Sequence, residues 1–176
     1  MKKKGIINIF LRYITLAVLG LNNLFIFYFI FTPITIFTSY FILNLFDPIT
    51  ILVKSANTII FKDFTIKIIP ACVAGAAYYL LLILNLTTPM KKRKRVNSLI
   101  FLILSFFILN IIRIVAFTLL ASGGFKYFDL AHKTTWYFGS TVMLIIIWFA
   151  NVKIFKIKEI PVYIDLKNIY KNIKTK

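Results

Sequence analysis

The chain has 176 residues, of which 60% are hydrophobic, and it carries 22 Lys and Arg against 5 Asp and Glu. A soluble domain of this length cannot bury so much apolar surface, so the composition indicates an integral membrane protein with a single domain. One cysteine excludes an internal disulfide and a multi-cysteine metal site, and one histidine excludes a histidine-rich metal site. We therefore expect no metal and no organic cofactor.

The net charge of +17 is concentrated in blocks between the apolar runs. These blocks are the N-terminal lysines with Arg12, the run KKRKR at 91–95 and the tail 151–176. Membrane proteins concentrate Lys and Arg in their cytoplasmic segments, so the pattern indicates orientation in a membrane and not binding of nucleic acid. We expect a multi-pass protein of the cell membrane with both termini in the cytoplasm.

Four apolar runs are close to the roughly 20 residues that a helix needs to cross a bilayer. They cover residues 14–32, 70–89, 98–121 and 134–150. The first run is too long for a secretory signal peptide and no small-residue cleavage site follows it, so we predict a retained span. The expected fold class is therefore all-α and integral to the membrane, with about four transmembrane helices.

Residues 34–57 include a further apolar stretch, whose position is ambiguous. If the N-terminus and KKRKR are both cytoplasmic, an odd number of spans must precede the second predicted span, which leaves room for one. Polar residues recur at steps of three or four along the stretch, and Pro33 and Pro48 flank its apolar part. We predict an amphipathic or re-entrant helix at the outer leaflet. The alternative is an ordinary span with the N-terminus outside, which leaves Cys72 on the same side.

Two segments outside the predicted spans have their own patterns. Residues 57–69 place β-branched and aromatic runs on either side of Lys62 and Asp63, which predicts a short β-hairpin at the outer surface. In the tail 151–176, apolar residues recur on one side of a helix and lysines lie mostly elsewhere. This pattern predicts a helix on the anionic cytoplasmic face of the membrane.

Three residues with reactive or charged side chains are predicted to lie at similar heights near the outer ends of three spans. At about 1.5 Å per residue, Cys72 lies about 27 Å from the inner boundary at Met90. Counted from Val96, Arg113 lies about 25 Å higher, and His132 lies about 30 Å above the inner end of its span. Ionisable residues inside a span are costly and by default mark a functional site.

Each of these side chains suits a step of cysteine catalysis. The thiolate of Cys72 is favoured at a helix N-terminus and by a nearby cation, and Arg113 is a cation that stays charged in a dry site. His132 can take a proton from the thiol and return it to a leaving group. Asn110 is predicted to orient Arg113, and Gly75 to let helices approach closely. The structural alternatives are inert packing for the thiol, an ion or hydrogen-bond pair for the guanidinium, solvation for the imidazole and an interhelical hydrogen bond for the amide.

Three motifs contain these residues: PACVAGAAYYLL, the N-x-x-R of NIIRI, and FDLAHKTTWYFG. In their order and spacing they resemble the exosortase/archaeosortase family of membrane cysteine transpeptidases, over roughly residues 33–150. The chain departs from the family pattern of Cys-Ser/Thr-Gly, because Val73 and Ala74 stand between Cys72 and Gly75. The departure removes the hydroxyl beside the nucleophile and points to a divergent subfamily of the small archaeal type.

The resemblance implies a sorting reaction at the outer face of the membrane. Its substrates would be secreted surface proteins that end in a short motif, an apolar helix and a basic cluster. Cys72 would attack the backbone carbonyl beside the motif and form a thioacyl enzyme, which a second nucleophile such as a membrane lipid resolves. Arg113 and His132 would serve as oxyanion or thiolate stabiliser and as general acid and base, in an assignment that the sequence leaves open.

Two other functions fit the same composition. In a small-solute transport subunit, Arg113 would bind an anionic ligand and replacement of Cys72 would be tolerated. In a structural membrane protein, the polar residues would only join helices. A transpeptidase differs from both, because loss of Cys72, Arg113 or His132 would abolish its activity.

Overall fold

The computed structural model of the chain describes residues 3–21 and 24–157, and the surface helix predicted for the tail falls mostly outside them. The helices are α1 (Lys3–Leu21), α2 (Phe25–Phe46), α3 (Pro70–Val73), α4 (Gly75–Thr87), α5 (Lys92–Ser122), α6 (Phe128–Thr134) and α7 (Ser140–Ile154). A three-stranded sheet contains β1 (Ile51–Val53), β2 (Thr58–Phe61) and β3 (Phe64–Lys67). A 3-10 turn, η1 (Lys54–Ala56), joins β1 to β2, and a π-helical segment, η2 (Thr135–Gly139), joins α6 to α7.

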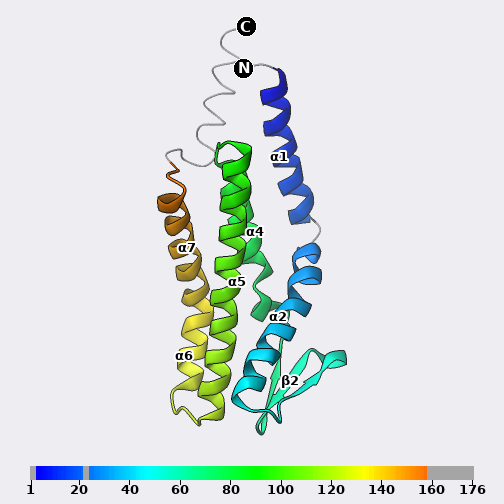
Figure 1. Cartoon of the computed structure of the whole chain (residues 1–176), viewed down its shortest axis with the longest axis vertical. Helices are drawn as coiled ribbons and strands as arrows, with labels where there is room; N and C mark the ends of the chain where they lie inside the picture. The colour runs from blue at the N-terminus through cyan, green and yellow to red at the C-terminus, as the bar shows by residue number, and fades with distance from the viewer. Residues whose placement is uncertain (1–2, 22–23, 158–176) are drawn as a thin grey trace.

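The expected fold class is confirmed by four helical segments that are long and apolar enough to cross a membrane. These are Phe25–Phe46, Pro70–Thr87, Lys92–Ser122 and Phe128–Ile154. The chain runs down the molecule through α1 and α2, up through α4, down through α5 and up again through α7 (Figure 1). The last three segments overlap the spans predicted at 70–89, 98–121 and 134–150.

The predicted boundaries of the N-terminal part are wrong. The apolar run 14–32 is divided between α1 and α2, and α2 continues through Pro33 to Phe46. The segment 34–57 is therefore not a separate helix, because its first half belongs to α2 and its second half to the sheet. Membrane helices tolerate an internal proline because neighbouring helices, Ser and Thr side chains and local adjustments of the helix satisfy the backbone groups that proline leaves free. Since α2 takes the place of the predicted first span, one candidate span still precedes Cys72 among the described residues.

The predicted hairpin is present and gains a third strand. β2 and β3 pair antiparallel from Phe61↔Phe64 at the turn to Thr58↔Lys67, and β1 pairs with the other side of β2. Lys62 takes the left-handed conformation that a two-residue turn requires, with φ 51°. The sheet is fixed to the bundle because Ile59 is fully buried in a core that it shares with α2, α3 and α5.

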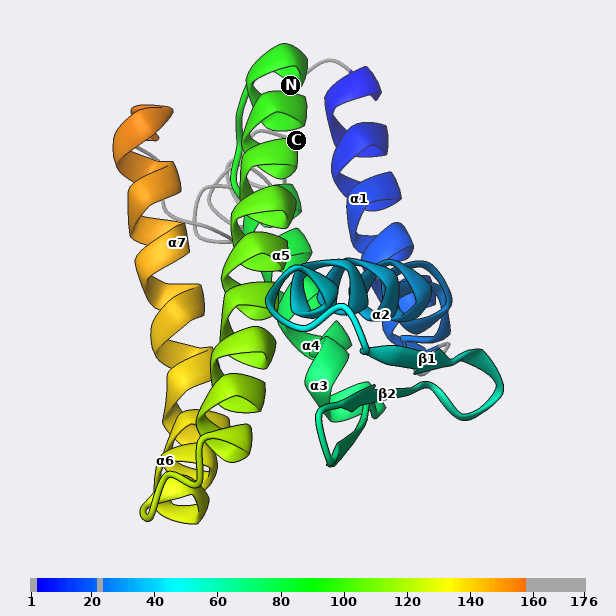
Figure 2. The same cartoon turned by 60° about the horizontal axis from the view of Figure 1, so that its bottom comes forward.

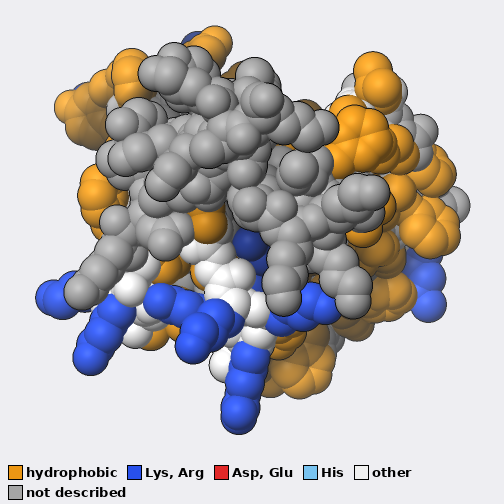
Figure 3. Space-filling model, turned by 90° about the horizontal axis from the view of Figure 1, so that it is seen from above, with side chains coloured by type: hydrophobic (Ala, Val, Ile, Leu, Met, Phe, Trp, Pro, Cys, Tyr) orange, Lys and Arg blue, Asp and Glu red, His pale blue; other side chains and the backbone are white. Residues whose placement is uncertain are grey.

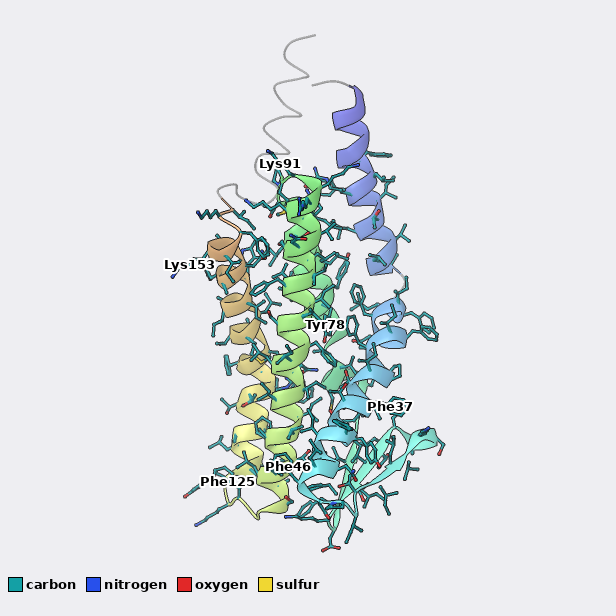
Figure 4. The ribbon with its side chains drawn as sticks, viewed as in Figure 1. Phe37, Phe46, Tyr78, Lys91, Phe125 and Lys153 are labelled. Carbon is teal, nitrogen blue, oxygen red and sulfur yellow. The ribbon has the colours of Figure 1, made fainter. Side chains whose placement is uncertain are left out.

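The two ends of the bundle differ in their balance of charge: lysines occur at both, but the described aspartates, Asp47, Asp63 and Asp129, all belong to the end that carries the sheet and α6. Lys91 and Lys153 lie at one end, and Phe46 and Phe125 lie at the other, beside the sheet (Figure 4). Lys and Arg side chains project from the first end when it is viewed along the bundle (Figure 3). We refer to these as the basic end and the sheet end.

Candidate active site

Cys72 lies in α3, a single helical turn that starts at Pro70 and is separated from α4 at Ala74. Ala74 adopts φ 57°, a left-handed conformation that is uncommon for a residue with a side chain. In a continuous helix the carbonyl of Cys72 would accept a hydrogen bond from the N–H four residues later. The break at Ala74 leaves this carbonyl available to other donors. Cys72 is thus not at the start of the long helix, as predicted, but in a separate turn before it.

The donors to this carbonyl come from α5. Asn110 Nδ2 donates over 3.0 Å and Arg113 Nη2 over 3.3 Å, while Arg113 Nη1 donates to Ser140 Oγ over 2.7 Å. Asn110 was predicted to orient Arg113, whereas the structure has both side chains on the same carbonyl of Cys72. The guanidinium therefore lies between the turn that holds the thiol and the start of α7.

A cavity of about 510 Å³ at the sheet end brings the three predicted residues together. Cys72, Arg113 and His132 all line it, from α3, α5 and α6. Apolar side chains form most of the remaining wall, and charged groups inside such a wall interact more strongly than they do in water. The similar heights estimated along three separate helices thus correspond to one shared space.

His132 is placed by two aromatic contacts. Its ring stacks on Phe128 at a centroid distance of 5.5 Å and meets Phe117 of α5 edge-on at 5.3 Å. His132 is exposed at the end of the bundle, whereas Cys72 and Arg113 are half-buried. The imidazole is therefore the most accessible of the three groups for proton exchange with solvent.

The π-helical segment η2 sets the relation between His132 and Ser140. A π turn contains one residue more than an α turn, so the step of eight residues covers about seven α-helical positions, close to two full turns. Both residues consequently fall on the same side of the helix, where His132 lines the cavity and Ser140 reaches Arg113. Sequence reasoning missed Ser140, because a hydroxyl near the start of a span carries no signal of its own.

Gly75 has a packing role immediately after the break. A Cβ at this position would lie 2.8 Å from the ring of Tyr28, so only glycine lets α2 approach α4 this closely. The close helix approach predicted for Gly75 is therefore made with α2. This contact fixes the position of α4 directly beside the turn that carries Cys72.

Sequence reasoning also missed the contribution of β3 to the site. Residues Phe64 to Lys67 all line the cavity, and Lys67 adds a second cationic side chain to its wall. Trp136 of η2, which is 51% exposed, also lines the cavity. The hairpin was predicted, but its position beside Cys72 follows only from packing against α5.

Comparisons of the chain with protein-family models, with curated proteins and with solved structures find no match. The chemistry of the site is therefore inferred from its residues. Within residues 3–21 and 24–157, no group of three or more His, Cys, Asp or Glu side chains is placed to hold a metal ion. The ionisable groups that the cavity offers are a thiol, a guanidinium, an imidazole and an ammonium.

Proposed function

We propose that the protein is a membrane-embedded cysteine transpeptidase of the archaeosortase/exosortase type. The observation that carries the proposal is that Cys72, Arg113 and His132, from three helices, line a single cavity. If each of the three residues had only a structural role, there would be no reason for all of them to line one cavity that is large enough for a peptide group. The motif resemblance supports the same conclusion from the sequence.

In the proposed reaction the sulfur of Cys72 attacks the scissile carbonyl carbon while its proton passes to His132. Arg113 stabilises the oxyanion that forms on the carbonyl oxygen. Two of the five N–H donors of a guanidinium bind Ser140 and the carbonyl of Cys72, which leaves the others for this oxyanion. The C–N bond then breaks, the leaving amine takes the proton from His132, and a thioester remains on Cys72.

The second half of the reaction repeats these steps with an acceptor. A nucleophile of a membrane lipid attacks the thioester, passes its proton to His132 and leaves the surface protein attached to the lipid. The proton then returns to the sulfur of Cys72, so the enzyme ends in its starting state. Water in place of the lipid would give hydrolysis by the same route.

The charge distribution supports an orientation with the cavity at the outer face. Lys and Arg gather at the opposite, basic end, as expected of a cytoplasmic side. Around the cavity end, Tyr127, Trp136 and Tyr137 are more than half exposed, which is typical of the aromatic belt at a membrane interface. A secreted protein held by one apolar helix would present the segment before that helix at this height.

The test is conversion of a co-expressed reporter, a small soluble domain followed by the C-terminal segment of a secreted protein from the same genome. This segment contains a polar stretch, an apolar helix and a basic cluster. Replacement of Cys72 by Ala should abolish conversion of precursor to mature reporter on an immunoblot, while the variant inserts at the wild-type level. Unchanged conversion would rule out the catalytic role.

A second function, binding of an anionic solute by a transport subunit, is favoured by the presence of Arg113 and Lys67 in the cavity wall. For variants of Cys72, a transport function predicts a different result from that predicted by a transpeptidase. Uptake would tolerate Cys72→Ala and would fail with Arg113→Gln. The same two variants therefore separate the two functions.

A further inference from the structure

β3 is an edge strand whose free side faces the cavity. The strand order is β1-β2-β3, and the N–H of Ile68 donates to Asn57 at the β2 side of the hairpin. Successive residues of a strand direct their backbone groups to opposite edges, so Thr65 and Lys67 direct theirs away from β2. No other described element forms a backbone hydrogen bond to Thr65 or Lys67. An unpaired row of N–H and C=O groups is thus available.

The free edge of β3 and Cys72 border the same cavity. Thr65 and Lys67 line the same cavity as Cys72, whereas no residue of β1, the opposite edge, lines it. Ile66 of β3 also packs against the core that the sheet shares with α2, α3 and α5, which holds the strand in place. Figure 2 shows the sheet next to α3 and alongside α2.

We propose that the free edge of β3 binds an extended segment of the substrate polypeptide as an added strand and directs its scissile bond to Cys72. The proposal rests on the proposed function and names how that site holds its substrate. Strand addition uses main-chain hydrogen bonds, which any extended sequence can make, and alternate side chains then contact the enzyme. The segment between a folded surface domain and an apolar helix is the part of such a substrate that can be extended.

Charge favours a foreign peptide over a second copy of this chain. Lys62 at the turn and Lys67 at the far end of β3 are both exposed. Lysine on an edge strand is a common protection against self-association, and Lys67 is the charge that protects this edge, since Lys62 is followed by Asp63 at the turn. A neutral or acidic substrate segment meets no repulsion from Lys67.

Disulfide trapping tests the proposal without catalysis. The chain carries Cys72→Ala and Thr65→Cys, and the reporter described above carries one cysteine, moved through the eight residues before its apolar helix. Side chains alternate along a strand, so trapping should be strong at every second reporter position and about fivefold weaker between them. The matched control is Ile51→Cys, which is 54% exposed on the opposite edge and should trap none of the reporters.

The outcomes separate this proposal from the proposed function. Alternating adducts at Thr65→Cys alone support strand addition, even if Cys72-dependent conversion fails and overturns the transpeptidase. Uniform adducts, equal adducts at both edges, or disulfide-linked copies of the chain without reporter overturn strand addition. Absence of adducts overturns strand addition too. If the wild-type chain still converts the reporter in that case, the transpeptidase function is retained.

A second variant measures the contribution of the edge to the reaction. Thr65→Pro removes an N–H that faces away from β2, so the hairpin remains paired. Thr65→Val keeps this N–H and a β-branched side chain. We expect conversion to fall about tenfold further with proline than with valine. An equal effect of the two substitutions would overturn the role of the backbone edge.

Discussion

Arg95 and Arg113 lie on the same helix, α5, and each donates hydrogen bonds to main-chain carbonyls near one end of α4. At the basic end, Arg95 binds the carbonyls of Asn85, Leu86 and Thr88, where every helix leaves carbonyls without internal partners. At the sheet end, Arg113 binds the carbonyl of Cys72, which is available only because the helix is interrupted. The first contact completes a helix, whereas the second depends on a costly break.

The polar networks around the two arginines differ in the same way. At the basic end, Asn85 donates to Ser98 and Ser98 to Asn151, and all three residues are fully buried between helices. At the sheet end, the network that includes Arg113 and Ser140 opens onto a cavity with a thiol and an imidazole. Under the proposed function, only the polar residues at the sheet end meet space for a substrate.

The largest expected effect distinguishes the two arginines. Arg113→Lys should lower reporter conversion at least about 100-fold, because one ammonium cannot replace the planar fork that binds Cys72 and Ser140 together. Arg95→Lys should leave conversion within about twofold and lower the midpoint of thermal unfolding in detergent. Equal losses of conversion in both variants would show that the two ends do not differ in function.

A smaller effect is expected for the serines that contact the two networks. Ser140→Ala should lower conversion about tenfold, since the guanidinium of Arg113 loses a hydrogen bond that fixes its orientation. Ser140→Thr retains the hydroxyl and should restore most of the rate. Ser98→Ala should instead lower the free energy of unfolding by roughly 1–3 kcal/mol at unchanged conversion, because it removes the buried hydrogen bonds from Asn85 Nδ2 and to Asn151 Oδ1. Normal conversion in Ser140→Ala would remove Ser140 from the site.

The sequence allowed prediction of the last three spans, the hairpin and the similar heights of Cys72, Arg113 and His132. These features depend on hydrophobic run length, β-branched composition and a constant helical rise, all of which are local. The path of α2 through Pro33 was not predictable, because proline is a helix breaker in water but is tolerated within an apolar bundle. The position of Ser140 depends on a π turn, for which the segment Thr135–Gly139 carries no distinctive residue pattern.

At the break before α4, packing determines which residue adopts the left-handed conformation. Glycine is the usual choice for a left-handed conformation, and Gly75 is adjacent. The ring of Tyr28, however, occupies the space where a Cβ of residue 75 would lie, so glycine is required there for contact. The left-handed conformation falls on Ala74 instead. No local pattern distinguishes these two uses of a glycine.

The smallest expected effect concerns this break and has opposite signs at two alanines. Ala74→Gly should raise the free energy of unfolding by about 0.5–1 kcal/mol, because relief of the left-handed strain exceeds the entropy that glycine adds to the unfolded chain. Ala77→Gly, within α4, should lower it by about 0.5–1 kcal/mol, as expected for glycine inside a helix. Conversion should stay within about twofold in Ala74→Gly, since glycine keeps the carbonyl of Cys72 open to Asn110 and Arg113. Denaturant titration of both variants in one detergent measures the signs, and destabilisation by Ala74→Gly would mean that α3 and α4 form one continuous helix.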